Sequence, residues 1–350
     1  MEKTKVQGEK AVQLNWFAEE NQHERLSKLG DPLEKLKVVN FETFRPVLKD
    51  ALEKERKSNA GRPPFDCVMM FKIIVLMTIY NLSYDQTEYQ ITDRLSFQRF
   101  LGISLGDKVP DAKTIWLFNE LLRQSGALSV VFAMFNSYLE TMGIITHKGT
   151  IIDATFVDAP KQRNTKDEND SIKEGETPEE WAENPHKLAQ KDVDARWAVK
   201  GKETHYGYKN HVKVDAESKI ILDHRTTPAS VHDSNVCTEM VDENDQELYA
   251  DSAYASREIA ERLPKHVKNN IHEKGYRDNP LTKEQKESNR IKSKTRCRIE
   301  HVFGFMTVAM HGITLRSIGI ERADFHNGLT NLVYNFFRYS IIQRRKLAMG

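Results

Sequence analysis

The sequence predicts an α/β protein in which an all-α N-terminal region precedes a mixed sheet with helices on its faces. Two observations lead to this fold class. Up to residue 149, apolar residues recur at helical spacing between capping residues and glycines, whereas from Thr150 onward runs of β-branched and apolar residues alternate with helical segments. The resulting order of elements, β-β-β-α-β-α-β-α, is typical of a mixed sheet covered by helices.

The composition is that of a folded chain. Its 350 residues are 39% hydrophobic and 29% charged, which allows a large core and excludes a wholly disordered chain. The three cysteines lie far apart, so neither a disulfide framework nor a cysteine-rich zinc module is expected. No signal-peptide pattern opens the sequence, and its longest apolar run, residues 67–80, contains Lys72 and is shorter than a membrane span. We therefore expect a cytoplasmic protein with no membrane partner.

Residues 1–60 are expected to form an N-terminal helical arm, and residues 61–146 a second helical region. Capping residues and glycine stops predict five helices in this second region, near 66–80, 83–91, 96–102, 111–126 and 128–142. Short helices with tight turns, the fourth beginning at Asp111 and carrying Lys113, are typical of a helix-turn-helix-like module that binds DNA through a recognition helix. A helical bundle packed on the next domain explains the same segment equally well.

Residues 147–312 are expected to form the sheet domain, and residues 313–350 a closing helical segment. The strands of the sheet are predicted at 150–157, 205–214, 219–227, 247–251 and 267–272. The helices that follow or separate them are predicted at 234–244, 256–263, 282–310 and 321–346. An insertion, residues 161–203, separates the first two strands.

Charge is distributed unevenly along the chain, although 52 Lys and Arg nearly balance 51 Asp and Glu. Within the insertion, residues 167–183 hold eight acids and one base, which predicts a solvated or poorly ordered loop. Trp181 and Trp197 are expected to anchor this insertion on the domain. Residues 265–300 hold eleven bases and five acids. Phosphate contacts are expected in this basic arm, although many basic helices are only solvated faces.

Three acids at separate positions in the sheet domain are candidate ligands for metal ions. Asp153 lies inside the first strand, where an ionised carboxylate is costly unless it has a partner or a metal. Asp251 lies at the carboxyl end of the fourth strand, where open α/β sheets bind ligands. Glu300 lies on the long helix, four residues after Arg296, so their side chains are neighbours.

These three acids converge only if the two strands are adjacent and the helix packs across their end, as in a ribonuclease H-like sheet. Three carboxylates then supply hard oxygen ligands for two Mg²⁺ ions about 3.5–4 Å apart, an arrangement suited to in-line displacement at phosphorus. Taken singly, each acid is more readily explained as a capped turn or a salt bridge.

Several motifs between residues 60 and 340 carry a family resemblance: Gly61-Arg62-Pro63-Pro64, Tyr80-Asn81-Leu82-Ser83-Tyr84, Asp153-Ala154-Thr155, His205-Tyr206-Gly207-Tyr208-Lys209-Asn210-His211, Pro228-Ala229-Ser230-Val231-His232-Asp233 and Asp251-Ser252-Ala253-Tyr254. Together they resemble bacterial insertion-sequence transposases of the DDE type, within the insertion-sequence-five group of the insertion-sequence-four-like superfamily. The resemblance implies that Asp153, Asp251 and Glu300 are the catalytic, metal-binding triad of a Mg²⁺-dependent DNA transposase, with Mn²⁺ as a substitute.

The third motif of this family runs Tyr, two residues, Arg, three residues, Glu, six residues, Lys. Arg296 and Glu300 match it, but Ser293 replaces the Tyr and Thr307 replaces the Lys. Arg296 is expected to offset phosphate charge. Candidate substitutes for the missing contacts to the transposon-end phosphate are Arg290, Lys292, Lys294 and Arg298.

Other basic residues are weaker candidates for DNA contacts. Lys209 and His211 alternate on one face of the second strand, where they either contact a scissile phosphate or occupy an exposed strand edge. Arg338, Arg344, Arg345 and Lys346 near the C-terminus are better explained as the solvated face of a helix than as DNA contacts.

The sequence thus predicts a DNA transposase that binds terminal inverted repeats and cuts and joins DNA. By analogy with the family, we expect a homodimer on DNA, associated with the bacterial nucleoid. Two alternatives stay open. One is a metal-dependent nuclease on the same fold that cuts but does not join, and the other is a protein that binds inverted repeats and represses without catalysis.

Overall fold

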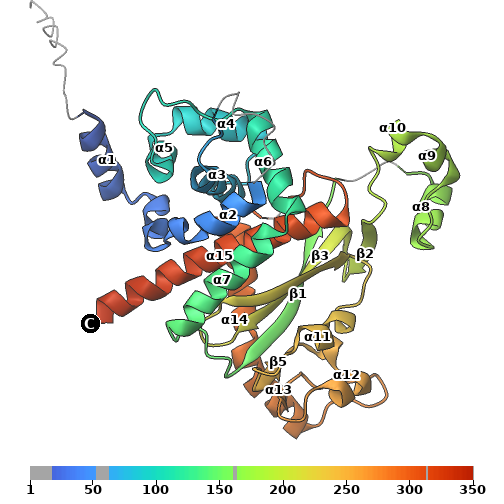
Figure 1. The fold of residues 1–350 in the computed structure, drawn as a ribbon. Coiled ribbons are helices and arrows are strands. Elements are labelled where there is room, and N and C mark those ends of the chain that lie inside the picture. Colours follow the sequence, from blue (N-terminus) through green and yellow to red (C-terminus); the bar gives the residue numbers. More distant parts are fainter. Residues whose placement is uncertain (1–17, 53–62, 161–163, 313, 350) are drawn as a thin grey trace, which may run out of the picture.

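The computed structural model describes residues 18–52, 63–160, 164–312 and 314–349 (Figure 1). The N-terminal region is helical, as predicted. Its elements are α1 (Ala18–Leu29), the 3-10 helices η1 (Pro32–Val38) and η2 (Phe41–Phe44), α2 (Arg45–Leu52), α3 (Cys67–Ile79), α4 (Tyr84–Asp93), α5 (Leu95–Leu101), α6 (Ala112–Gln124) and α7 (Ala127–Thr141).

The helix starts in this region follow the predicted capping chemistry. The Asp66 carboxylate accepts hydrogen bonds from the backbone N–H groups of Val68 and Met69 at the start of α3. Ser83 and Gln86 form the reciprocal capping box that opens α4. α3 is buried on nearly every face, which explains its almost uniformly apolar sequence.

The sheet has the order β2-β3-β1-β5-β6, with β4 also paired to β3. Its strands are β1 (Thr150–Asp158), β2 (Arg196–Lys200), β3 (Glu203–Asp215), β4 (Ile221–Pro228), β5 (Glu247–Tyr249) and β6 (Lys268–Asn269). β1 runs antiparallel to β3 and parallel to β5. Gly207 permits the close approach of β3 to β1, because a Cβ at this position would lie 2.3 Å from the Val157 carbonyl oxygen. β1 and β5 are therefore neighbours, as expected for a ribonuclease H-like sheet.

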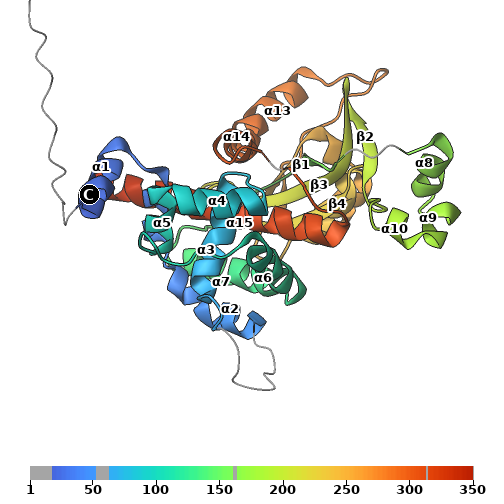
Figure 2. The ribbon, with the colours of Figure 1, turned by 90° about the horizontal axis from the view of Figure 1, so that it is seen from above.

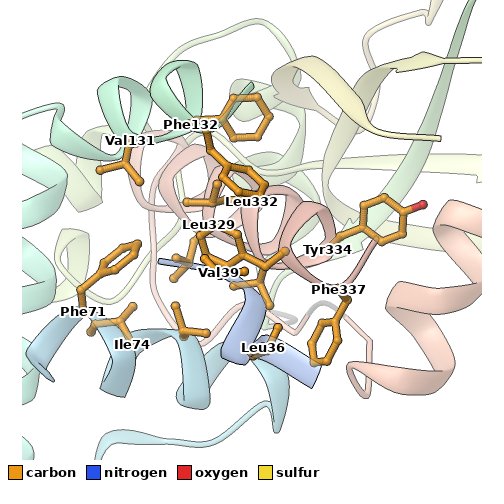
Figure 3. Packing of buried hydrophobic residues seen from close by; sticks show 14 of the residues in the cluster. Leu36, Val39, Phe71, Ile74, Val131, Phe132, Leu329, Leu332, Tyr334 and Phe337 are labelled. Atoms are coloured by element: carbon orange, nitrogen blue, oxygen red, sulfur yellow. The ribbon is translucent and has the colours of Figure 1, made fainter. Parts of the chain in front are cut away.

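The helix α15 (Ile320–Met349) joins the two halves of the molecule. It packs on β4 and β3 along part of its length and on η1, α3 and α7 elsewhere, and Figures 1 and 2 show it running between the N-terminal helices and the sheet. The buried Phe336 ring of α15 contacts the rings of Phe41, Phe44 and Phe135. One apolar cluster therefore includes the N-terminal helices, β1, β3 and α15 (Figure 3).

The prediction of one long helix at 282–310 is wrong in one respect. The segment is broken at Cys297 into two helices, α13 (Lys283–Arg296) and α14 (Arg298–Ala309). The two helices have different environments. α13 buries no residue, whereas α14 buries Ile299, Val302 and Met306 and packs on β1. The break lets the apolar face of α14 turn onto the sheet, while the polar α13 contacts β5.

The prediction of a solvated or poorly ordered loop at 167–183 is also wrong. This segment forms α8 (Lys166–Lys173) and α9 (Glu179–Glu183), followed by α10 (Pro185–Leu188). The Trp181 ring is fully buried, and its Nε1 donates to Glu168 Oε1 over 2.6 Å. Glu168 also completes a capping box with Thr165 at the start of α8. Several acids of this segment thus lie in the first turns of helices, where negative charge is stabilising.

The remaining elements, α11 (Ser234–Met240), the 3-10 helix η3 (Ser252–Tyr254) and α12 (Arg257–Arg262), pack around β5 and β6 in a second apolar cluster. Within the described ranges, no single helix is long and apolar enough to cross a membrane. Only α3 and α4 taken together pass that test, and they are bent by 106° relative to each other.

Candidate active site

Asp153 occupies the middle of β1, and its side chain is 17% exposed. Its Oδ1 accepts a hydrogen bond from the backbone N–H of Ala154 over 2.8 Å. Burial raises the pKa of the Asp153 carboxyl to about 6, and the negative charge of Asp251 adds to this rise. The two carboxylates therefore repel each other across the site.

Asp251 lies just beyond the end of β5, which pairs directly with β1. This adjacency confirms the strand arrangement that the sequence argument required. Asp251 also caps η3, since its Oδ1 accepts a hydrogen bond from the Ala253 N–H over 2.7 Å. The cap fixes the carboxylate at the carboxyl end of the strand.

Arg296 connects the other two acids of the predicted triad. Its Nη2 donates to Glu300 Oε1 over 2.7 Å, and its Nη1 lies 3.4 Å from Asp153 Oδ2. The Arg296 side chain is 20% exposed, whereas that of Glu300 is 61% exposed in the first turn of α14. The predicted proximity of Arg296 and Glu300 is thus confirmed, although the two residues belong to different helices.

Comparison with known proteins identifies the family of this chain. Residues 145–336, more than half of the chain, match the family model described as the transposase DDE domain. The chain belongs to the DDE transposase family. Residues 20–121 match a second model, described as a transposase domain. Among solved structures, the chain is similar to the piggyBac transposase in a synaptic complex with hairpin DNA, at 11% identity and a TM-score of 0.45, over 89% of this chain and 75% of that chain.

The residues of this transposase site fit divalent metal ions in their chemistry. Asp153 and Asp251 are hard oxygen ligands, and the raised pKa of Asp153 reflects the burial of its carboxylate together with the nearby charge of Asp251, both of which a bound cation would offset. Glu300 is held by Arg296. In the part of the chain that the structure describes, no three Asp, Glu, His or Cys side chains gather closely enough to hold a metal ion. Arg296 lies between the carboxylates that would have to converge.

His272 belongs to this transposase site, although the sequence argument did not single it out. Its backbone N–H donates to the Ala250 carbonyl over 3.1 Å, directly before Asp251, and its Nε2 lies 3.3 Å from Ser293 Oγ. Burial and the positive charges of Arg296 and Lys292 lower the pKa of His272, while Asp251 opposes them. The sequence feature that could have pointed to His272 is its position at the end of the last predicted strand, residues 267–272.

Tyr254 was also missed by the sequence argument. Its ring is fully buried, and in the described part of the chain its hydroxyl has no hydrogen-bond partner. Burial and the nearby charges of Asp153 and Asp233 raise the pKa of this phenol. Tyr254 therefore packs as a neutral group behind the carboxylates.

Lys209 and His211 lie within the fold of the transposase rather than at an exposed strand edge, because β1 and β4 both pair with β3 along this stretch. Lys209 Nζ lies 2.7 Å from Asp233 Oδ1 and donates to the Val231 carbonyl over the same distance. His211 is fully buried, with its Nε2 2.8 Å from Thr227 Oγ1, and burial lowers its pKa to about 4. Their side chains thus take part in internal contacts.

The other predicted DNA contacts lie on the surface of the transposase. Lys113 is exposed in the first turn of α6, and Lys294 is exposed near the end of α13. Arg298 Nη1 donates to the Ala216 carbonyl over 2.7 Å. Arg290 pairs with a neighbouring glutamate of α13, and Lys292 donates to the backbone at Ile271. Of these five residues, Lys113 and Lys294 have the charged groups that are least held by contacts within the protein.

Proposed function

We propose that this DDE transposase binds the terminal inverted repeats of an insertion sequence of the insertion-sequence-five group and catalyses metal-dependent DNA cleavage and strand transfer. The observation that supports this most directly is the group formed by Asp153 in the middle of β1, Asp251 just beyond the adjacent strand β5, and Arg296 and Glu300 from α13 and α14. Carboxylates next to one arginine suit chemistry at a phosphodiester, where metal ions and a guanidinium offset negative charge.

Asp153 and Asp251 would hold two Mg²⁺ ions, with Mn²⁺ as a substitute, and Glu300 would complete one of the two sites. The chemistry supplied by such a pair is activation of the attacking oxygen and stabilisation of the leaving oxygen. In the first reaction, water attacks the phosphodiester at the transposon end and frees a 3′-hydroxyl. In the second, that hydroxyl attacks target DNA, so no covalent protein nucleophile is needed.

The role of Arg296 follows from its position. Its guanidinium has five N–H donors, and two of its nitrogens already face carboxylates. Donors that remain are available to a phosphate oxygen of the scissile strand. Arg296 would therefore orient the phosphodiester next to Glu300, without taking part in proton transfer.

DNA recognition is proposed to involve α4, α5 and α6 of the N-terminal region. α4 packs against both α5 and α6, and α6 presents Lys113 and the half-exposed Trp116 to solvent. These features suit a helix-turn-helix-like module with α6 as recognition helix. Joining two ends to one target suits a homodimer on DNA, acting in the bacterial cytoplasm at the nucleoid.

The test uses the inverted repeats that flank the gene. Purified protein is incubated with Mg²⁺ and either intact or pre-cleaved end DNA together with a target plasmid, and cleavage and joining are scored separately. We expect both reactions in the natural protein and neither in the Asp153→Asn, Asp251→Asn and Glu300→Gln variants, while end binding is kept. Asp158→Asn is the matched control, because Asp158 lies on the same strand with a 65% exposed side chain.

The outcomes separate the alternatives. Cleavage of end DNA without joining would identify a nuclease. Binding of the ends without either reaction, equally in the natural protein and in the three variants, would identify a repressor-like binding protein. Either result would overturn the proposed transposition chemistry.

A further inference from the structure

Four cations from three separate parts of the chain gather around the turn between β3 and β4. Lys219 lies in this turn, Arg298 begins α14, and Arg338 and Arg345 lie on α15. Arg298 Nη1 donates to the Ala216 carbonyl over 2.7 Å, and Arg338 Nε donates to the Ser218 carbonyl. Both arginines therefore hold the turn from opposite helices. We call these four residues the hairpin cation cluster.

The hairpin cation cluster lacks neutralising acids. None of its four members forms an ion pair within the described residues, unlike many other cations of the chain. Burial lowers the pKa of Lys219, and the positive charges of Arg338 and Arg298 lower it further. Gathering like charges in this way is unfavourable, so the cluster favours the binding of an anion.

Two acids lie in the same turn, but neither compensates the cluster. The Asp215 carboxylate is fully buried and accepts hydrogen bonds from Thr146, His147 and Ser218. Glu217 is exposed and forms no ion pair among the residues described. The positive charge is thus open to a partner from outside the chain.

We propose that the hairpin cation cluster is a docking surface for the backbone phosphates of duplex DNA that extends from the active site. This inference rests on the proposed function. Arg298 is two residues before Glu300, so the cluster begins within one helical turn of the active site, although the two side chains leave α14 on different faces. Arg345 follows Arg338 by seven residues, which puts both on one face of α15 about 10 Å apart. The four cations therefore form a track rather than a single anion pocket.

A purely structural role explains only half of the cluster. Arg298 and Arg338 stabilise the turn through its carbonyls, and this function needs no DNA. Lys219 and Arg345 form no side-chain hydrogen bond among the described residues, so the structural role does not account for them. The experiment therefore changes these two.

The test measures binding of the full chain to a duplex of about 40 base pairs with arbitrary sequence, by fluorescence anisotropy across a KCl series, without metal. The variant is Lys219→Asn/Arg345→Gln. Asn suits position 219, where φ is 63°. The matched control, Arg25→Gln/Lys49→Gln, removes two exposed cations that have no ion pair in the described residues and lie on α1 and α2.

Each lost phosphate contact should lower the slope of log affinity against log salt by about 0.9, so the double variant should lose about 1.8, or about 30-fold in affinity at 0.15 M salt. The single variant Arg345→Gln should lose about half of that slope, which guards against misfolding of the turn. The control pair should match the natural protein. The KCl series is then repeated with inverted-repeat DNA. Comparing the two duplexes distinguishes binding of flanking or target DNA from specific binding of the transposon ends.

Two outcomes overturn the inference in distinguishable ways. If the natural protein binds DNA with a steep slope and both cluster variants keep that slope, the hairpin cation cluster is only structural, and the proposed function stands. If the natural protein binds neither DNA at low salt, the proposed function fails together with the cluster.

Discussion

Replacing Asp153 by Asn should stabilise the metal-free protein. Because the pKa of this carboxyl is raised from an ordinary 3.8 to about 6, the folded state holds its proton more tightly than the unfolded state does. Stability therefore falls as pH rises from about 4 to about 6, and the full penalty applies above that. Two pKa units correspond to about 3 kcal/mol.

Asn removes this whole penalty, because the attraction of Arg296 for the ionised Asp153 already opposes the rise and is included in the pKa of about 6. Asn Oδ1 still accepts the hydrogen bond that Ala154 donates to Asp153. The expected effect is a gain of about 3 kcal/mol, or a rise of about 4 °C in Tm for a chain of this size.

The assay is thermal unfolding in EDTA at several pH values, with Asp158→Asn as control. Asp153→Asn should melt higher than the natural protein at about pH 7.5 and show no advantage at about pH 3.5. Saturating Mg²⁺ should raise the Tm of the natural protein more than that of the variant. A variant that melts lower than the natural protein in EDTA at neutral pH would refute the electrostatic account of this site.

Two further predictions concern buried cations. Arg296→Lys keeps one charge but cannot reach two carboxylates with a planar fork, so single-turnover cleavage should slow by about 10-fold to 100-fold, and a rate within twofold of normal would contradict the proposed bridging role. Lys213→Met leaves the fully buried Asp245 without its ion pair and should cost about 3–5 kcal/mol in urea unfolding. Adding Asp245→Asn should restore part of that loss, and additive losses would argue against the pair.

Much of the site was predictable from sequence because it depends on local spacing and on strand order. The four-residue step from Arg296 to Glu300 predicts a contact whether or not the helix continues, and the contact survives the break at Cys297. The break itself was not predictable, because helix-forming residues run through it without glycine or proline. It depends instead on how the apolar face of α14 meets β1.

The burial of Lys209 and His211 could not be inferred from alternation alone. Alternation shows that both side chains share one face of a strand, but it does not tell whether partners cover both edges of that strand. β3 is flanked by β1 and β4 along this stretch, and Asp233 reaches Lys209 from the connection after β4. Long-range pairing of this kind leaves no local pattern in the sequence.

The prediction of a loop at residues 167–183 failed for the opposite reason. Local signals for helices were present there, but the acidic composition was given more weight. Thr165 and Glu168 have the spacing of a capping box, the same pattern that correctly placed the start of α4. Trp181 then supplies the apolar group around which the helices of the insertion pack. Acidic residues at helix starts stabilise helices, so a high acid content did not predict disorder here.

The two contacts of Arg296 differ in length, and this difference suggests different roles for Glu300 and Asp153. The contact to Glu300, at 2.7 Å, has the length of a charge-assisted hydrogen bond, whereas the contact to Asp153, at 3.4 Å, is longer than that range. Arg296 therefore compensates the charge of the Glu300 carboxylate well and that of the Asp153 carboxylate poorly. Because Asp153 is the more buried carboxylate and also faces Asp251, it gains more from a further cation than Glu300 does. We therefore propose that the aspartate pair is the stronger site for a first divalent ion, and that Glu300 joins it when Arg296 exchanges the Glu300 carboxylate for another anion such as a DNA phosphate.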